Sequence, residues 1–158
     1  MPDHAIDLVK ADVILNQVVA PTVKSAQIAS GVLTITFDSP VKLIDGMSAD
    51  LILGTVTAGT KGTSDPDPVA NFAVDDAREG FTDGVQFTNT AAGSTVLKIA
   101  VKGWTGNSGD SGTSSSIVLE NNVLVSATDD TMVFAGDTIT VSANHVDVST
   151  AGPHACTT

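Results

Sequence analysis

Hydrophobic and polar positions alternate most clearly in the stretch that begins at Val23. Two alternating runs, Val23–Ile28 and Val32–Phe37, flank the short segment Ala29–Gly31, and glycine in such a segment permits a tight turn. A period of two places alternate side chains on opposite faces of a strand, so this stretch predicts a β-hairpin. Pro40 follows, and we expect it to end the second strand because proline cannot donate to a ladder.

Further short runs with strand composition follow, separated by glycine, asparagine and aspartate. The runs are Ala49–Val56, Val69–Val74, Gly84–Thr88, Thr95–Lys102, Ser116–Glu120, Val123–Ala127, Thr131–Phe134, Thr138–Ala143 and His145–Val148. Asn121–Asn122, Gly136–Asp137 and Ala143–Asn144 are turn signals, and the first predicts a two-residue hairpin because Asn tolerates positive φ. Short strands at this spacing predict a sandwich or barrel.

The alternation also predicts which side chains form the core. The expected core residues are Ile28, Leu33, Ile35, Phe37, Leu51, Leu53, Phe87, Leu97, Ile99, Val101, Leu119, Ile139 and Val141.

Composition supports the same fold class. The chain has 158 residues, of which 42% are hydrophobic and only 16% are charged, and it contains 20 Thr and 20 Val but no Tyr. Abundant β-branched residues and scarce helix formers exclude a helical bundle or coiled coil and indicate an all-β protein. The length predicts one domain. We expect the β-sandwich at 22–150, an N-terminal arm or first strand at 1–21, and a C-terminal tail at 151–158.

The first twenty residues are rich in apolar side chains but have mixed periodicity. So much apolar surface does not stay in water, so the segment either buries against another subunit or forms the first strand of its own sandwich. Both interpretations stay open. On the first, a homo-oligomer is expected, as a trimer, with interface residues Ile6, Leu8, Val9, Val13, Ile14 and Leu15.

The chain is strongly acidic, with a formal net charge of −11 and a pI near 4.2. Only seven Lys and Arg residues are present, too few for a stripe that neutralises phosphates, so nucleic-acid and anionic-membrane partners are not expected. Met1–His4 lacks the basic region that opens a signal peptide, and synthesis in the cytoplasm is expected.

Acids, histidines and the single cysteine give weak metal signals. Asp65, Asp67, Asp75, Asp76, Glu79 and Asp83 gather in one stretch, where a divalent ion such as calcium is one interpretation and solvated turns another. The spacing of an EF-hand is absent, so we favour turns. His4, His145, His154 and Cys156 include one close pair, His154 and Cys156, which falls short of a zinc motif. No metal or cofactor is expected.

Catalytic patterns are equally weak. No Gly-x-Ser-x-Gly elbow and no phosphate-binding glycine loop before a helix occurs, so an enzyme is not expected. Trp104, the only tryptophan, opens a Gly/Ser-rich stretch. It serves either as a core plug or as an interface anchor, because tryptophan is enriched at binding hot spots.

The stretch Val23-Lys-Ser-Ala-Gln-Ile-Ala-Ser-Gly-Val-Leu-Thr-Ile-Thr-Phe-Asp-Ser-Pro-Val41 resembles the opening hairpin of bacterial immunoglobulin-like (Ig-like) surface repeats. The resemblance implies an Ig-like β-sandwich. By architecture and composition alone, a small acidic sandwich with an N-terminal arm is also similar to the decoration (cement) proteins of tailed bacteriophages. That likeness implies oligomers seated on a capsid lattice and carries over no functional residues.

Three functions therefore stay open from the sequence. The first, which we favour, is a structural virion protein, a capsid decoration protein that stabilises a phage head by contacting the major capsid protein or another virion protein. The second is a surface adhesin or surface-layer module of Ig-like type, with calcium as its candidate ion. The third is a hydrolase built on a sandwich.

Overall fold

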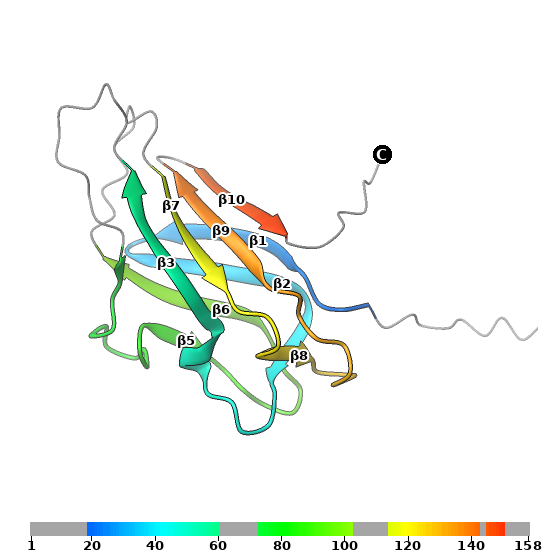
Figure 1. Ribbon diagram of the computed structural model, residues 1–158. Coiled ribbons are helices and arrows are strands. Elements are labelled where there is room, and N and C mark those ends of the chain that lie inside the picture. The colour runs from blue at the N-terminus through cyan, green and yellow to red at the C-terminus, as the bar shows by residue number, and fades with distance from the viewer. Residues whose placement is uncertain (1–18, 61–72, 103–113, 143–144, 151–158) are drawn as a thin grey trace, which may run out of the picture.

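Two antiparallel sheets make up the protein in a computed structural model that describes residues 19–60, 73–102, 114–142 and 145–150 (Figure 1). The elements are β1 (Val23–Ala29), β2 (Val32–Leu43), a 3₁₀ turn η1 (Ala49–Ile52), β3 (Leu53–Thr60), β4 (Ala73–Val74), β5 (Val85–Phe87), β6 (Ser94–Lys102), β7 (Ser114–Leu119), β8 (Leu124–Ser126), β9 (Asp137–Ser142) and β10 (His145–Thr150). The all-β prediction is confirmed.

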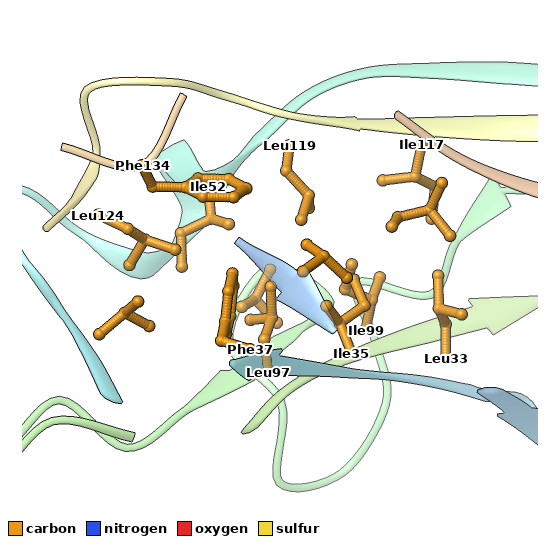
Figure 2. Close-up of a cluster of buried hydrophobic side chains, with 14 of the residues drawn as sticks. Leu33, Ile35, Phe37, Ile52, Leu97, Ile99, Ile117, Leu119, Leu124 and Phe134 are labelled. Carbon is orange, nitrogen blue, oxygen red and sulfur yellow. The ribbon is translucent and has the colours of Figure 1, made fainter. Parts of the chain in front are cut away.

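The larger sheet has the order β1-β2-β6-β4, with β5 also paired to β6 and β8 paired to the end of β2. The smaller sheet has the order β10-β9-β7-β3. Buried side chains from both sheets join one hydrophobic cluster, which gives a sandwich-like arrangement. Figure 2 shows Ile117 and Leu119 of the smaller sheet facing Leu33, Ile35 and Leu97 of the larger one.

The predicted β1–β2 hairpin is confirmed, and its turn explains its sequence. Ser30 and Gly31 have φ of 52° and 71°, the left-handed values that a two-residue hairpin turn needs. A Cβ added at Gly31 would lie 3.2 Å from the carbonyl oxygen of Val101, so this position needs glycine for space as well as for φ.

Pro40 does not end β2, and that expectation is wrong. β2 runs to Leu43 and gains a neighbour along its length: Val32–Thr36 and Val41 pair with β6, and Val41–Leu43 pair with β8. Pro40 lies in the interval where the register with β6 shifts, so its missing N–H interrupts no ladder. Its carbonyl oxygen instead accepts a hydrogen bond from the Ala127 N–H at 2.9 Å.

The Asn121–Asn122 hairpin is also wrong. Asn122 does adopt a positive φ of 63°, but the strands on either side belong to different sheets. β7 pairs with β3 and β9, whereas β8 pairs with β2. The segment therefore carries the chain from one layer to the other.

Two expected strands differ in part. Residues 49–52 form the turn η1, with the Leu51 N–H donating to the Ser48 carbonyl at 3.2 Å, and the strand begins only at Leu53. Residues 131–134 form no strand; Val133 makes a single bridge with Val125. In the expected strand 69–74, only Ala73–Val74 belong to the described residues.

The predicted core is confirmed at Leu33, Ile35, Phe37, Leu97, Ile99, Val101, Leu119, Ile139 and Val141. Ile28, Leu53 and Phe87 are half-buried and pack against it. Leu51 is wrong: it is 46% exposed, because the 3₁₀ turn directs Ile52 inward in its place. Phe134 was not expected, yet its ring meets Phe37 edge to face at 5.4 Å (Figure 2).

Candidate functional site: the arm root and the sheet margins

The interface residues expected from the sequence, Ile6, Leu8, Val9, Val13, Ile14, Leu15 and Trp104, lie outside the described residues. The structure does describe the segment to which the N-terminal residues attach. We call Val19–Thr22, together with Asp38, the arm root. Val19 is 65% exposed, the largest exposed fraction among the large hydrophobic residues of the described part.

Three hydrogen bonds hold the arm root against β2. The Asp38 N–H donates to the Thr22 carbonyl at 3.0 Å, the Thr22 N–H donates to Asp38 Oδ1 at 2.9 Å, and the Thr22 hydroxyl donates to Asp38 Oδ2 at 3.0 Å. Pro21 beside them is buried. The chain therefore enters β1 along a fixed line, continuous with the β1–β2 ladder.

The edge of the larger sheet next to the arm root is short and irregular. β1 pairs only with β2 among the described residues, and a register shift at Lys24 sets three β1 residues opposite two of β2. An extra residue and an exposed lysine are two ways in which edge strands resist pairing with other chains.

The edge of the smaller sheet at the same margin is regular. All six residues of β10 pair with β9 in unbroken register, from His145 opposite Ser142 to Thr150 opposite Asp137. Within the described ranges β10 has no second ladder partner, although β1 of the other sheet lies close to it. In an antiparallel ladder every second residue turns its N–H and C=O away from its partner, and for these groups of β10 the described residues supply no ladder partner.

The opposite margin is broken on both sheets. The β3–β7 ladder shifts register twice, between Leu53 and Val56 and again between Thr57 and Thr60. Across from it, the described part of β4 comprises Ala73 and Val74. Register shifts of this kind twist an edge away from straight pairing.

The acidic stretch forms tight turns in its described part, which contains Asp75, Asp76, Glu79 and Asp83. The Asp75 N–H donates to the Ala100 carbonyl at 2.8 Å, and its own carbonyl accepts from the Arg78 N–H at 3.2 Å. Asp83, at φ 49°, lies in a two-residue turn closed by two 2.9 Å bonds between Thr82 and Val85. These acids therefore have the local turn role expected of aspartate.

The other candidate ligands add no site to this picture. Asp65, Asp67, His4, His154 and Cys156 lie outside the described residues, and His145 opens β10. Within the part of the chain that the structure describes, no three His, Cys, Asp or Glu side chains come together as metal ligands.

Asp129 shows how the remaining acids are used. Its Oδ1 accepts from the Thr131 hydroxyl at 2.7 Å and from the Thr131 N–H at 3.0 Å, and these bonds lower the pKa of Asp129 below its usual value. Its neighbour Asp130 lies 3.9 Å from the Lys42 ammonium, an exposed pair of small energetic weight.

Three polar side chains are buried in the described part: Ser115, Ser126 and Asp137. Ser126 Oγ bonds the Thr128 hydroxyl at 3.0 Å. Ser115 Oγ has no hydrogen-bond partner among the described residues, and it shares its strand face with buried Ile117 and Leu119. A lone hydroxyl at the end of an apolar core gives no arrangement of nucleophile and base.

Sequence reasoning missed the arm root. Asp38-Ser39-Pro40 has the composition of a turn, and nothing in this pattern indicates that Asp38 stays in the strand and bonds Thr22, 16 residues away. The two acceptor oxygens of Asp38 match the two donors of Thr22, but only the β1–β2 register brings them together.

No helix among the described residues is long and apolar enough to span a bilayer. The chain matches no protein family model, no curated protein sequence and no solved structure.

Proposed function

We propose that the domain is an Ig-like sandwich and that the protein is a structural component of a virion, a decoration protein that stabilises a phage capsid through protein–protein contacts. The strand order supports the Ig-like assignment. In an Ig domain, strands A, B, E and D form one sheet and C, F and G form the other. Here β1, β2, β6 and β5 occupy the first set of positions, and β3, β7 and β9 occupy the second.

β10 then has no counterpart in the seven-strand pattern. It follows the strand in the G position directly and extends that sheet by one strand. An added strand that ends a sheet moves the free edge outward, to a place where another chain can reach it.

The observation that carries the assembly role is the combination at one margin of the regular β10 edge and the arm root. The β10 edge offers backbone hydrogen bonds. The arm root, with exposed Val19, is where the apolar N-terminal segment of the sequence joins the domain. Strand addition satisfies such an edge and covers apolar side chains in one step.

The proposed partners are further copies of the chain, as a trimer, and the major capsid protein of the shell. The proposed location is the virion, after synthesis in the host cytoplasm. A net charge of −11 opposes non-specific association, so contacts between copies have to be specific ones. The proposed role is mechanical and uses no cofactor.

Sedimentation of the full chain tests this role. We expect a trimer that co-sediments with empty shells assembled from the major capsid protein of the same phage. A monomer that leaves such shells unbound would contradict the proposal.

The alternative is a surface adhesin or surface-layer module. The same Ig-like strand order and the acidic turns at 75–83 favour it. That function predicts a melting temperature that rises with added calcium and falls again with a chelator. A decoration protein without a calcium site shows neither change.

A further inference from the structure

We propose that the free edge of β10 receives the N-terminal arm, residues 4–18, of a second copy of this chain. The arm adds as a strand and extends the four-stranded sheet across the boundary between two subunits. This inference rests on the proposed assembly role, and it assigns the contact between two copies of the chain to one strand, β10.

The choice of β10 follows from a comparison of the sheet edges in the described part of the chain. β1 is interrupted at Lys24, β3 shifts register twice, and β4 is described only over Ala73–Val74. β10 alone in this set keeps six consecutive residues in register with its neighbour. A regular edge of this length, without a bulge, is the kind that a soluble protein has to cover.

The choice of the arm follows from its composition and length. Residues 4–18 include seven Ile, Leu and Val residues and no proline, so they can form a strand whose side chains have apolar surface to bury. At about 3.3 Å per residue, the 18 residues before Val19 span at most about 60 Å when extended. Six of them cover β10, and the rest leave up to about 40 Å of connection, enough to reach a neighbouring subunit.

The arm root favours a second copy over the same chain. β1 begins on the side of the sandwich where β10 ends (Figure 1). An arm that lies along its own β10 therefore has to reverse direction before Thr22, which Asp38 holds in line with the hairpin. A neighbouring copy imposes no such reversal.

Cross-linking between differently labelled copies tests the proposal. Both copies carry Cys156→Ser to remove the native thiol. One copy carries Leu8→Cys and a size tag, and the other carries Ser149→Cys on β10, opposite Thr138 in the register. The two are mixed, allowed to exchange subunits and treated with a short bismaleimide. The matched control replaces Ser149→Cys by Thr57→Cys, on the opposite edge of the same sheet.

We expect a covalent heterodimer with Ser149→Cys at a yield several times that obtained with Thr57→Cys. Equal yields, or a product with Thr57→Cys alone, would overturn the assignment to β10. A single chain carrying both Leu8→Cys and Ser149→Cys is the second measurement. If it yields cross-linked monomer and no covalent oligomer, the arm covers its own edge and the proposal is wrong.

Sedimentation separates this failure from failure of the proposed function. A trimer whose arm cross-links elsewhere leaves the assembly role standing and removes the β10 contact. A full chain that sediments as a monomer removes both. Circular dichroism and melting of each cysteine variant verify that a missing cross-link does not reflect misfolding.

Discussion

The two margins of this sandwich differ in regularity, although the same core lies between them. At one margin β10 runs six residues in unbroken register beside β1 and the arm root. At the other, β3 shifts register twice and faces the described part of β4. Bulges protect an edge strand from pairing with another chain, so the two register shifts of β3 protect the second margin. At the first margin β1 has a similar protection in its register shift at Lys24, whereas β10 pairs with β9 without a shift. Under our proposal, a strand from another copy covers β10.

If the proposed assembly is correct, edge regularity, more than edge hydrophobicity, marks the contact between copies. The exposed apolar side chains Met47 and Leu51 lie in and beside η1, away from the regular edge, and scattered apolar residues of this kind are ordinary on protein surfaces. Val19 differs from them, because it directly follows the apolar N-terminal segment of the sequence and lies in the arm root, which leads into β1. β1 in turn lies close to the edge strand β10.

Deleting residues 1–18 has the largest expected effect on this comparison. The assembly dissociates to a folded monomer, because the margin that depends on the arm loses its cover while the broken margin is unaffected. Sedimentation measures the mass, and far-UV circular dichroism reports the retained sheet signal. A truncated chain that keeps the oligomeric state of the full chain would show that the regular margin is not the contact.

Leu33→Ala has the next largest expected effect, and it changes the hydrophobic core that lies between the two margins. Leu33 is fully buried in β2, so the substitution leaves a cavity and costs about 2–5 kcal/mol of unfolding free energy. Urea denaturation of the arm-deleted chain, if it is a monomer, measures this cost without a contribution from assembly. An unchanged midpoint would mean that Leu33 does not face the core.

Gly31→Ala affects the turn of the β1–β2 hairpin at the regular margin. It combines a φ of 71° with a contact 3.2 Å from the Val101 carbonyl oxygen, and we expect a loss of about 1–3 kcal/mol. Gly46→Ala is the matched control, since Gly46 has a φ of 84° but no atom within 4 Å of an added Cβ. The same urea titration compares them, and an equal loss at both positions would show that the close carbonyl has no effect.

Asp38→Asn has the smallest expected effect. The substitution removes the negative charge that strengthens both Thr22 hydrogen bonds; the new amide N–H can still donate to the Thr22 hydroxyl, and the backbone bond between the two residues persists. We expect a loss of about 0.5–1.5 kcal/mol in unfolding free energy. Asp130→Asn, which removes only an exposed ion pair, serves as the control and changes stability by less than about 0.5 kcal/mol. A smaller loss for Asp38→Asn than for this control would contradict a stabilising role of the Thr22–Asp38 hydrogen bonds.

The sequence was sufficient wherever local pattern and sheet position agree. The β1–β2 hairpin follows from alternation and from the Ser30–Gly31 turn, and β6 keeps its predicted bounds to within one residue. Leu97, Ile99 and Val101 fall on the buried face that alternation assigns to them.

Where the chain changes layers or neighbours, the local pattern was not sufficient. Asn121–Asn122 has the chemistry of a hairpin turn, but whether Leu119 and Leu124 pair with each other depends on strands distant in the sequence. Pro40 is tolerated because it lies between Thr36 and Val41, where the register of β2 with β6 shifts and just before β8 joins β2. Phe134 ends a segment that was expected as a strand but makes only one bridge, so strand alternation does not account for its burial against Phe37.

The candidate site was accessible from the sequence only in part. The apolar composition of the first residues points to a contact, but alternation cannot distinguish an arm from a first strand. The regular edge at β10 and the Thr22–Asp38 bonds depend on the register of the sheets, which the sequence alone does not specify.

Amide hydrogen exchange at β10 tests most directly whether the arm of another copy covers this edge. In the full chain at high concentration, the N–H groups of β10 that point away from β9 should exchange slowly. The same groups should exchange at least about tenfold faster after dilution to the monomer or after deletion of residues 1–18, while the β3 amides keep their rates. β10 amides that exchange equally fast in the full chain and in the arm-deleted chain, or whose protection survives dilution to the monomer, would contradict strand addition between copies.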